Sequence, residues 1–253
     1  MIEVRNLNKS IKNKTILNNI NLSFKNKVTY AILGQNGAGK TTFIKTLFNE
    51  YKINSGKITL NGKEISKEEY KNMYFFTENN ELPIDLKVSE YLKYYLGISG
   101  FRKNINDYIL KLEWLFDYKK YKNTLIKKLS AGEKKKLTLF IMLILDPEII
   151  FFDEPTANLD EKNKVILFKI FSLLKEKNKT LIIISHLIDE IKTFIDHVVI
   201  FKEGQIVYNH ELKKEDDIKK IYHKYIFDEE DENKKSMDKD IELKMKGIFK
   251  NEN

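Results

Sequence analysis

The most specific chemistry in the sequence lies in a glycine-rich segment that ends in a lysine and a threonine. It reads Gly34-Gln35-Asn36-Gly37-Ala38-Gly39-Lys40-Thr41 and fits the pattern G-x-x-x-x-G-K-[ST]. The glycines let main-chain N–H groups curl around phosphate oxygens, and the lysine reaches the β- and γ-phosphates. A β-rich run from Val28 to Leu33 enters the segment, and residues with helical spacing follow it. We therefore expect a phosphate loop at a helix N-terminus, with Thr41 on Mg²⁺ and Thr42 among the nucleotide contacts.

Two adjacent carboxylates end a second apolar segment. Ile149–Phe152 predicts a buried strand, and Asp153 and Glu154 follow it. Only the C-terminal tip of such a strand meets solvent, so both acids would be accessible there. One could bind a metal ion while the other accepts a proton. We expect Asp153 to act on Mg²⁺ through its coordination sphere and Glu154 to polarise an attacking water as general base. Taken alone, a strand that ends in Asp-Glu is equally compatible with an ordinary exit into a loop.

A histidine lies just past the end of another apolar run. His186 follows Leu181–Ser185, and a single histidine is more often a surface or capping residue. Its position favours function, because open α/β sheets bind ligands beyond the carboxyl ends of their strands. A neutral His186 would contact the γ-phosphate or orient the water, and so report whether ATP or ADP is bound.

A third motif distinguishes this chain from phosphate-loop ATPases in general. Leu129-Ser130-Ala131-Gly132-Glu133 resembles the LSGGQ signature of ABC ATPases, and it precedes Asp153 with the spacing usual in that family. The run from Asp153 to Asp160, DEPTANLD, resembles the Walker B element with its D-loop, and His186 resembles the switch histidine. The resemblance covers about residues 1–210.

The resemblance implies a composite site for ATP and Mg²⁺. Ser130 and the main-chain N–H groups near Gly132 would form a second anion site at a helix start, facing the phosphate loop of another subunit. That subunit is a second nucleotide-binding domain, either an identical copy or a paralogue, and the turn from Ala157 to Asp160 would cross the interface. The alternative for Ser130 is a helix N-cap with nothing bound.

Two positions depart from the family pattern. Glu78 stands where the family usually has a glutamine, so it would bind Mg²⁺ more strongly or repel the γ-phosphate. If the register is shifted, Glu78 is only a solvated loop residue. Ile11 aligns with the aromatic residue that stacks on adenine and offers apolar contact alone. Stacking on a base contributes about 1–3 kcal/mol, so we expect weaker nucleotide affinity or looser base selectivity.

The elements that must position these residues alternate between strand-length apolar runs and helical patterns. This alternation predicts a mainly parallel α/β sheet, and short runs near the N-terminus predict a small antiparallel sheet. A helical segment with Ser89 as its cap is expected inside an insertion over about residues 82–145. The resemblance makes the fold class a P-loop NTPase of α/β type with a RecA-like sheet, an N-terminal antiparallel β subdomain and an inserted helical subdomain. We expect an ATPase domain over 1–210 and a charged helix and tail over 211–253. The strand-length runs are Ile2–Val4, Ile20–Phe24, Tyr30–Leu33, Lys57–Leu60, Met73–Phe76, Ile149–Phe152, Leu181–Ile184 and Val198–Phe201.

Composition sets limits on the kind of protein. The 253 residues are 42% hydrophobic, which suits one domain or a core with one inserted subdomain. The longest nearly unbroken apolar run, Leu137 to Leu145, is far shorter than the roughly 20 residues that cross a bilayer. No leader pattern opens the sequence, and its zero cysteines exclude disulfides and thiolate chemistry. The net charge of +8 is spread along the chain and predicts no nucleic-acid partner.

These observations lead to a specific functional hypothesis. The resemblance implies a cytoplasmic ATP-hydrolysing subunit that lies on the inner face of the cell membrane through a separate membrane-spanning partner. The small size favours an exporter. One alternative is an ABC ATPase acting on nucleic acid or ribosomes, but the long coiled coils or paired ATPase domains of such proteins are missing. The other is a weakly hydrolysing regulatory subunit, which the presence of Glu154 and His186 disfavours.

Overall fold

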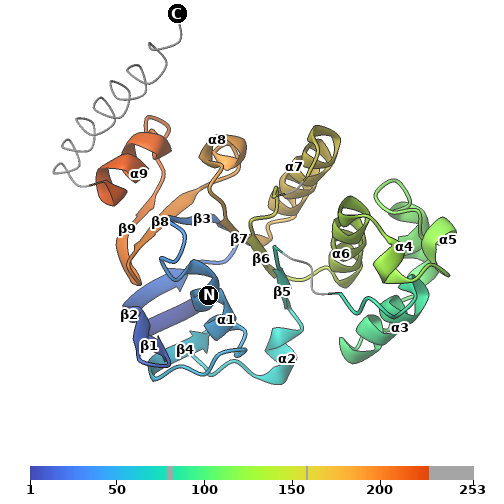
Figure 1. Cartoon of the computed structure of the whole chain (residues 1–253), viewed down its shortest axis with the longest axis horizontal. Helices are drawn as coiled ribbons and strands as arrows, with labels where there is room; N and C mark the ends of the chain where they lie inside the picture. The colour runs from blue at the N-terminus through green and yellow to red at the C-terminus, as the bar shows by residue number, and fades with distance from the viewer. Residues whose placement is uncertain (79–81, 158, 228–253) are drawn as a thin grey trace, which may run out of the picture.

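A six-stranded sheet runs through the centre of the molecule in the computed structural model, which describes residues 1–78, 82–157 and 159–227 (Figure 1). Its first five strands are parallel, and the last pairs antiparallel with its neighbour. In spatial order the strands are β5 (Met73–Phe76), β6 (Ile149–Asp153), β7 (Thr180–Ile184), β3 (Thr29–Gly34), β8 (His197–Lys202) and β9 (Gln205–Glu211). The mainly parallel sheet is confirmed. β9 was not predicted, because its side chains are mostly exposed or half-buried and do not form an apolar run.

A second, antiparallel sheet forms the N-terminal subdomain. It consists of β1 (Ile2–Ile11), β2 (Lys14–Phe24) and β4 (Ser55–Leu60), in the order β2-β1-β4. The first two strands are longer than the apolar runs indicated. The outer part of their hairpin carries polar and asparagine side chains with only partial burial, so the hydrophobic pattern stops before the strand does.

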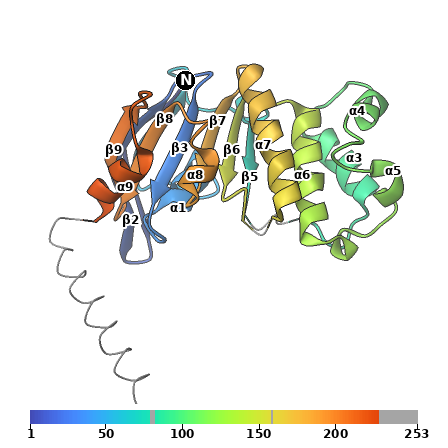
Figure 2. The same cartoon turned by 90° about the horizontal axis from the view of Figure 1, so that it is seen from above.

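Helices cover both faces of the central sheet, and a group of them fills the segment between β5 and β6 (Figure 1). The helices outside that segment are α1 (Lys40–Leu47), α2 (Lys67–Tyr70), α7 (Glu161–Glu176), α8 (Ile188–Ile191) and α9 (Ile218–Ile226). The inserted group consists of α3 (Val88–Ile98), α4 (Ile105–Lys111), α5 (Tyr118–Tyr121), a 3₁₀ turn (Ile126–Lys128) and α6 (Ala131–Leu145). Figure 2 shows α6 and α7 side by side, with the remaining inserted helices beyond α6.

The start of α3 corrects one prediction. Lys87, and not Ser89, is the N-cap residue, and its main-chain N–H donates to the Glu90 carboxylate at 2.8 Å. Ser89 therefore lies within the first turn. At the other end of the chain, Asp217 caps α9, a helix within the charged segment expected from residue 211. The tail expected beyond it, at 228–253, lies outside the described residues.

The central sheet separates two hydrophobic cores. Successive side chains of a strand point to opposite faces, so Ile182 and Ile184 of β7 pack with α1 and the antiparallel sheet. Leu181 and Ile183 pack on the other face with α6, α7 and α9. Because both faces are covered, only the strand ends are left for function. Across residues 1–78, 82–157 and 159–227, no helix combines the length and apolar character that a bilayer crossing requires.

The aromatic packing of α7 gives a stability prediction. Phe171 is 0% exposed, and its ring lies 4.9 Å from that of Phe152 in an edge-on arrangement. We expect Phe171→Ala to lower the free energy of unfolding by about 3–5 kcal/mol, because it removes buried apolar surface and leaves a cavity. Urea denaturation measures the change. Trp114→Ala is the control, since Trp114 is 55% exposed and should change stability by about 0.5 kcal/mol or less. Equal effects of the two substitutions would contradict this description of the core.

Candidate functional site

The glycine-rich segment forms the connection from β3 to α1, and two of its glycines, Gly34 and Gly39, meet close neighbours. A side chain at Gly34 would place Cβ 2.4 Å from the carbonyl oxygen of Phe201. Gly39 has a φ of 101°, and a Cβ there would lie 2.9 Å from the carbonyl oxygen of Ile16. Side chains other than hydrogen would therefore push the segment away from β2 and β8.

The start of α1 is arranged to receive an anion. Gly39 is its N-cap residue and has no side chain that could bond to the free N–H groups of the first turn. Next to these groups, Lys40 is only 7% exposed, and its Nζ donates to the carbonyl oxygens of Gly34 (2.7 Å) and Gln35 (3.0 Å). Burial lowers the pKa of Lys40. A buried ammonium beside a helix start that has no side-chain cap is a suitable site for phosphate.

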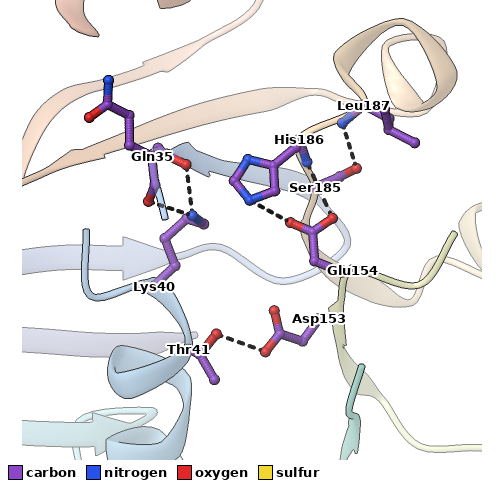
Figure 3. Close-up of polar contacts among 9 residues, drawn as sticks. Gln35, Lys40, Thr41, Asp153, Glu154, Ser185, His186 and Leu187 are labelled. Atoms are coloured by element: carbon purple, nitrogen blue, oxygen red, sulfur yellow. Dashed lines mark hydrogen bonds and ion pairs between the residues drawn. The ribbon is translucent and has the colours of Figure 1, made fainter. Parts of the chain in front are cut away.

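The tip of β6 lies directly opposite α1. The Thr41 hydroxyl donates to Oδ2 of Asp153 at 2.9 Å (Figure 3). Asp153 is buried, and burial raises the pKa of its carboxyl group. A hydroxyl and a carboxylate are hard oxygen donors of the kind that Mg²⁺ prefers, and Mg²⁺ typically takes few protein ligands and completes its sphere with water and substrate phosphates. The two side chains therefore fit this ion.

Glu154 is held in an uncommon conformation next to Asp153. Its φ is 45°, in the left-handed region, and its main-chain N–H donates to the carbonyl oxygen of Ile184 at 3.0 Å. The main-chain N–H of His186 donates to Oε2 of Glu154 at 3.3 Å. Nε2 of His186 also lies 3.2 Å from Oε1, a contact that would be an ion pair with a protonated imidazole (Figure 3). Within the described residues, buried Oε1 has no hydrogen-bond partner, which leaves it free to accept a proton from water.

The electrostatics of this pair suit proton transfer near neutral pH. Burial raises the pKa of Glu154 from 4.5 to about 7. Burial and the nearby Lys40 lower the pKa of His186, which favours the neutral imidazole at pH 7. A carboxyl group with this pKa exchanges its proton readily under physiological conditions.

These side chains line one open hollow of about 310 Å³. It lies at the carboxyl ends of β3, β6 and β7, where the sequence analysis expected the site. Three loop residues outside the lining hold the loop through their carbonyl oxygens. Those of Gly34 and Gln35 accept from Nζ of Lys40, and that of Ala38 accepts from the N–H of Gly204. The predicted site residues in the lining are Asn36, Gly37, Gly39, Lys40, Thr41, Thr42, Glu78, Asp153, Glu154 and His186.

The lining also contains residues that the sequence analysis missed, and it lacks one that was expected. Lys14 and Ile16, at the start of β2, line the hollow beside the loop. Ile11 is outside this lining and 39% exposed at the end of β1, although it pairs with Lys14 across the hairpin. Nothing in the local sequence indicates that Lys14 and Ile16 belong to a nucleotide site. They could have been found only from the pairing of β1 with β2.

The signature-like segment is elsewhere in the same chain. Ser130 and Gly132 are at the start of α6 and do not line the hollow. Ser130 is an N-cap, since its Oγ accepts from the main-chain N–H of Glu133 at 3.2 Å, and its own N–H donates to the Glu133 carboxylate. The cap uses the hydroxyl oxygen only as an acceptor, so its proton remains available to a ligand.

Glu78 and the turn from Ala157 to Asp160 are the two remaining parts of the predicted site. Glu78 follows β5 as an exposed residue and lines the hollow, so its carboxylate lies on the same side as Asp153 and Glu154. Ala157 and Asp160 of the expected interface turn are described, whereas Asn158 lies outside the described residues.

Comparison with known proteins identifies the family. The ABC transporter family profile matches residues 17–157. A phosphonates import ATP-binding protein of Fusobacterium nucleatum is 31% identical over 241 residues, which cover 88% of this chain and 98% of that protein. A lantibiotic transport ATP-binding protein of Streptococcus pyogenes is 29% identical over 226 residues, covering 89% of this chain and 97% of that protein.

A solved ATP-binding cassette supports the fold. It is described as dimeric, in a post-hydrolysis state and bound to ADP and Pi, and it superimposes with a TM-score of 0.72 at 21% identity, covering 84% of this chain and 99% of that one. The family profile spans more than half of this chain and contains the glycine loop together with Asp153 and Glu154. The chain therefore belongs to the ABC transporter ATP-binding proteins.

Proposed function

We propose that this protein binds MgATP in the hollow that Lys40, Asp153 and Glu154 help to line, and hydrolyses it with Glu154 as general base. Hydrolysis would power transport through separate membrane-spanning subunits. One observation carries the proposal. The buried Oε1 of Glu154, which has no hydrogen-bond partner among the described residues and lies 3.2 Å from Nε2 of His186, is in the same hollow as Lys40 and the Thr41–Asp153 pair. A proton acceptor, a phosphate-binding ammonium and a pair of oxygen donors are together what phosphoryl transfer to water requires.

Each side chain has a distinct task in this proposal. The N–H groups at the start of α1 and the Lys40 ammonium bind the β- and γ-phosphates, exchanging the bonds that Nζ makes to Gly34 and Gln35. Thr41 and Asp153 hold Mg²⁺, which when bound would neutralise charge on the phosphate oxygens. Glu154 Oε1 accepts a proton from the attacking water, and neutral His186 lies beside it to orient that water or to contact the γ-phosphate. Glu78 approaches the same hollow and would add a carboxylate near the ion.

The pH dependence of turnover tests the role of Glu154. Its pKa is raised from 4.5 to about 7, and only the ionised form accepts a proton. We therefore expect kcat/KM to fall about tenfold per pH unit below about pH 7, and to level off above it. Phosphate release should be followed from about pH 5 to 8.5 with saturating Mg²⁺. A plateau that extends down to about pH 5, as for an ordinary glutamate, would contradict the assignment.

The second half of the nucleotide site is proposed to come from another nucleotide-binding domain. Ser130 and Gly132 do not line the hollow of their own chain, and the hollow is open to solvent. An exposed γ-phosphate is poorly shielded from bulk water, whereas a helix start with a free hydroxyl proton and N–H groups could cover it. The start of α6 in a second copy or a paralogue would supply this cover, and the turn from Ala157 to Asp160 would lie at the contact. Ile11 would give the adenine an apolar neighbour at the edge of the site.

The finer biological setting is also a proposal. The protein would lie on the cytoplasmic face of the membrane through its membrane-spanning partner. Purification from native membranes should recover it together with a hydrophobic subunit, and recovery with ribosomes or nucleic acid would favour the alternative ABC ATPase. Export stays a prediction from size alone, because relatives of similar identity are described for phosphonates import and for lantibiotic transport.

A further inference from the structure

A buried cation lies outside the proposed nucleotide contacts. Lys135, in α6, is only 4% exposed. Burial lowers the pKa of its ammonium, while the negative charge of Glu78 draws it upward. Burying a charged group costs free energy unless its donors find hydrogen-bond acceptors. The acceptors that Lys135 binds therefore indicate its role.

Those partners are two main-chain oxygens in the turn that follows Glu154. Nζ of Lys135 donates to the carbonyl of Pro155 at 3.4 Å and also to the carbonyl of Ala157. The other two carbonyls of the turn are used locally: that of Glu154 accepts from the N–H of Ala157 at 3.1 Å, and that of Thr156 accepts from Leu159 at 3.2 Å. Lys135 therefore supplies a donor to the two carbonyls, those of Pro155 and Ala157, that the local main-chain N–H groups do not bind.

The turn that follows Glu154 holds this proposed general base in position. Glu154 has a left-handed φ of 45°, a conformation that a non-glycine residue keeps only when its surroundings hold it there. On one side its N–H is bonded to Ile184 of β7, and on the other the Lys135 ammonium anchors the turn to α6. Ser130 is the N-cap of the same helix.

We infer that Lys135 is a positioning residue that ties the placement of the Glu154 carboxylate to α6, the helix that Ser130 caps. A shift of α6 relative to the sheet moves the ammonium and with it the two carbonyls after Glu154. The inference rests on the proposed role of Glu154 as base, and it makes the geometry of hydrolysis depend on where the inserted helices lie. Nucleotide binding, by contrast, does not depend on it, because Lys135 does not line the hollow.

Substitution of Lys135 in the full chain tests this coupling. Lys135→Met keeps the length and apolar stem but removes all donors, so we expect kcat to fall about 10²-fold, the usual cost of misplacing a catalytic group by about 1 Å. KM and the dissociation constant of a fluorescent ATP analogue should stay within about twofold, because binding residues are untouched. Lys135→Gln keeps two N–H donors on a shorter, neutral side chain and should lose less, about tenfold. The matched control is Lys136→Met, one position along the same helix, which should retain wild-type kcat.

The outcomes separate this inference from the proposed function. If the wild-type chain does not hydrolyse ATP, the proposed function fails first. If the wild type hydrolyses and Lys135→Met does so at an equal rate, the inference is overturned. A loss of kcat matched by an equal loss of nucleotide affinity overturns it as well, since that is a general structural defect. Should Lys135→Met fail to fold, Lys135→Gln decides: a reduced kcat with unchanged KM supports the coupling, and a wild-type kcat rejects it.

Discussion

Replacing Glu154 with glutamine should lower ATP turnover by about 10²–10⁴-fold, the range that general-base catalysis contributes. The amide keeps the shape of the side chain and can still accept from the His186 main-chain N–H, but it has no basic oxygen for the proton of water. ATP binding should survive, because the phosphate contacts of Lys40 and the start of α1 are unchanged. Phosphate release under saturating MgATP gives the rate, and retention of unhydrolysed ATP on the protein gives the bound state.

The same substitution should also change the assembly of the protein. Since hydrolysis would normally reopen the two nucleotide-binding domains, Glu154→Gln should accumulate an ATP-bound dimer in light scattering. Glu148→Gln is a suitable control, because it alters an exposed glutamate at the opposite end of β6, paired with Lys179. Phosphate release at the wild-type rate by Glu154→Gln would remove Glu154 from the role of base.

The second large effect is expected from Lys40. Lys40→Met removes an ammonium that is buried beside the first N–H groups of α1, which have no side-chain cap. A hydrogen bond to a charged group contributes about 1.5–3 kcal/mol, so ATP should bind about 10- to 100-fold more weakly. The charge that develops on the γ-phosphate also loses its cation, and kcat should fall by about 10²–10³-fold. Calorimetric titration with ATP and steady-state phosphate release measure the two effects separately.

A lysine farther along the same helix provides the control for that experiment. Lys45 is half-buried and lies 3.7 Å from the exposed carboxylate of Glu50. Lys45→Met should leave ATP affinity within about twofold, because Lys45 does not line the hollow and its long, partly exposed ion pair with Glu50 contributes little. If Lys45→Met and Lys40→Met weaken ATP binding equally, the effect comes from net charge, and the specific role of Lys40 is wrong.

The sequence indicated where the local parts of the candidate site lie, because the positions of these residues depend on their neighbours along the chain. The loop from Gly34 to Thr41 needs Gly34 and Gly39 where β8 and β2 approach, and the spacing of the motif places glycine at both positions. Asp153, Glu154 and His186 end apolar strands, and the parallel sheet brings strand ends to one edge.

Features that depend on tertiary contacts were not predictable in the same way. The three consecutive lysines 134–136 resemble a solvated helix face, and nothing in that run indicates that Lys135 alone among them is nearly inaccessible. Lys14 and Ile16 enter the site only because β2 passes beside the loop. The raised pKa of Glu154 likewise arises from burial in the folded chain. Ser89 was mistaken for a cap because serine favours that position, whereas the main-chain N–H of Lys87 pairs with the Glu90 carboxylate in the fold.

The composite site is the central claim, and cross-linking between copies tests it most directly. The natural sequence has no cysteine, so Asn36→Cys beside the phosphate loop and Ala131→Cys at the start of α6 would be the only thiols. Both residues are exposed, and the Glu154→Gln background should hold the closed state. With MgATP and a short bifunctional maleimide, the double-cysteine chain should give a covalent dimer on a denaturing gel, whereas either single-cysteine chain, or the double without nucleotide, should stay monomeric. Efficient labelling of both thiols with no ATP-dependent dimer would contradict the claim that the Ser130 helix start of one copy covers the nucleotide held by Lys40 of another.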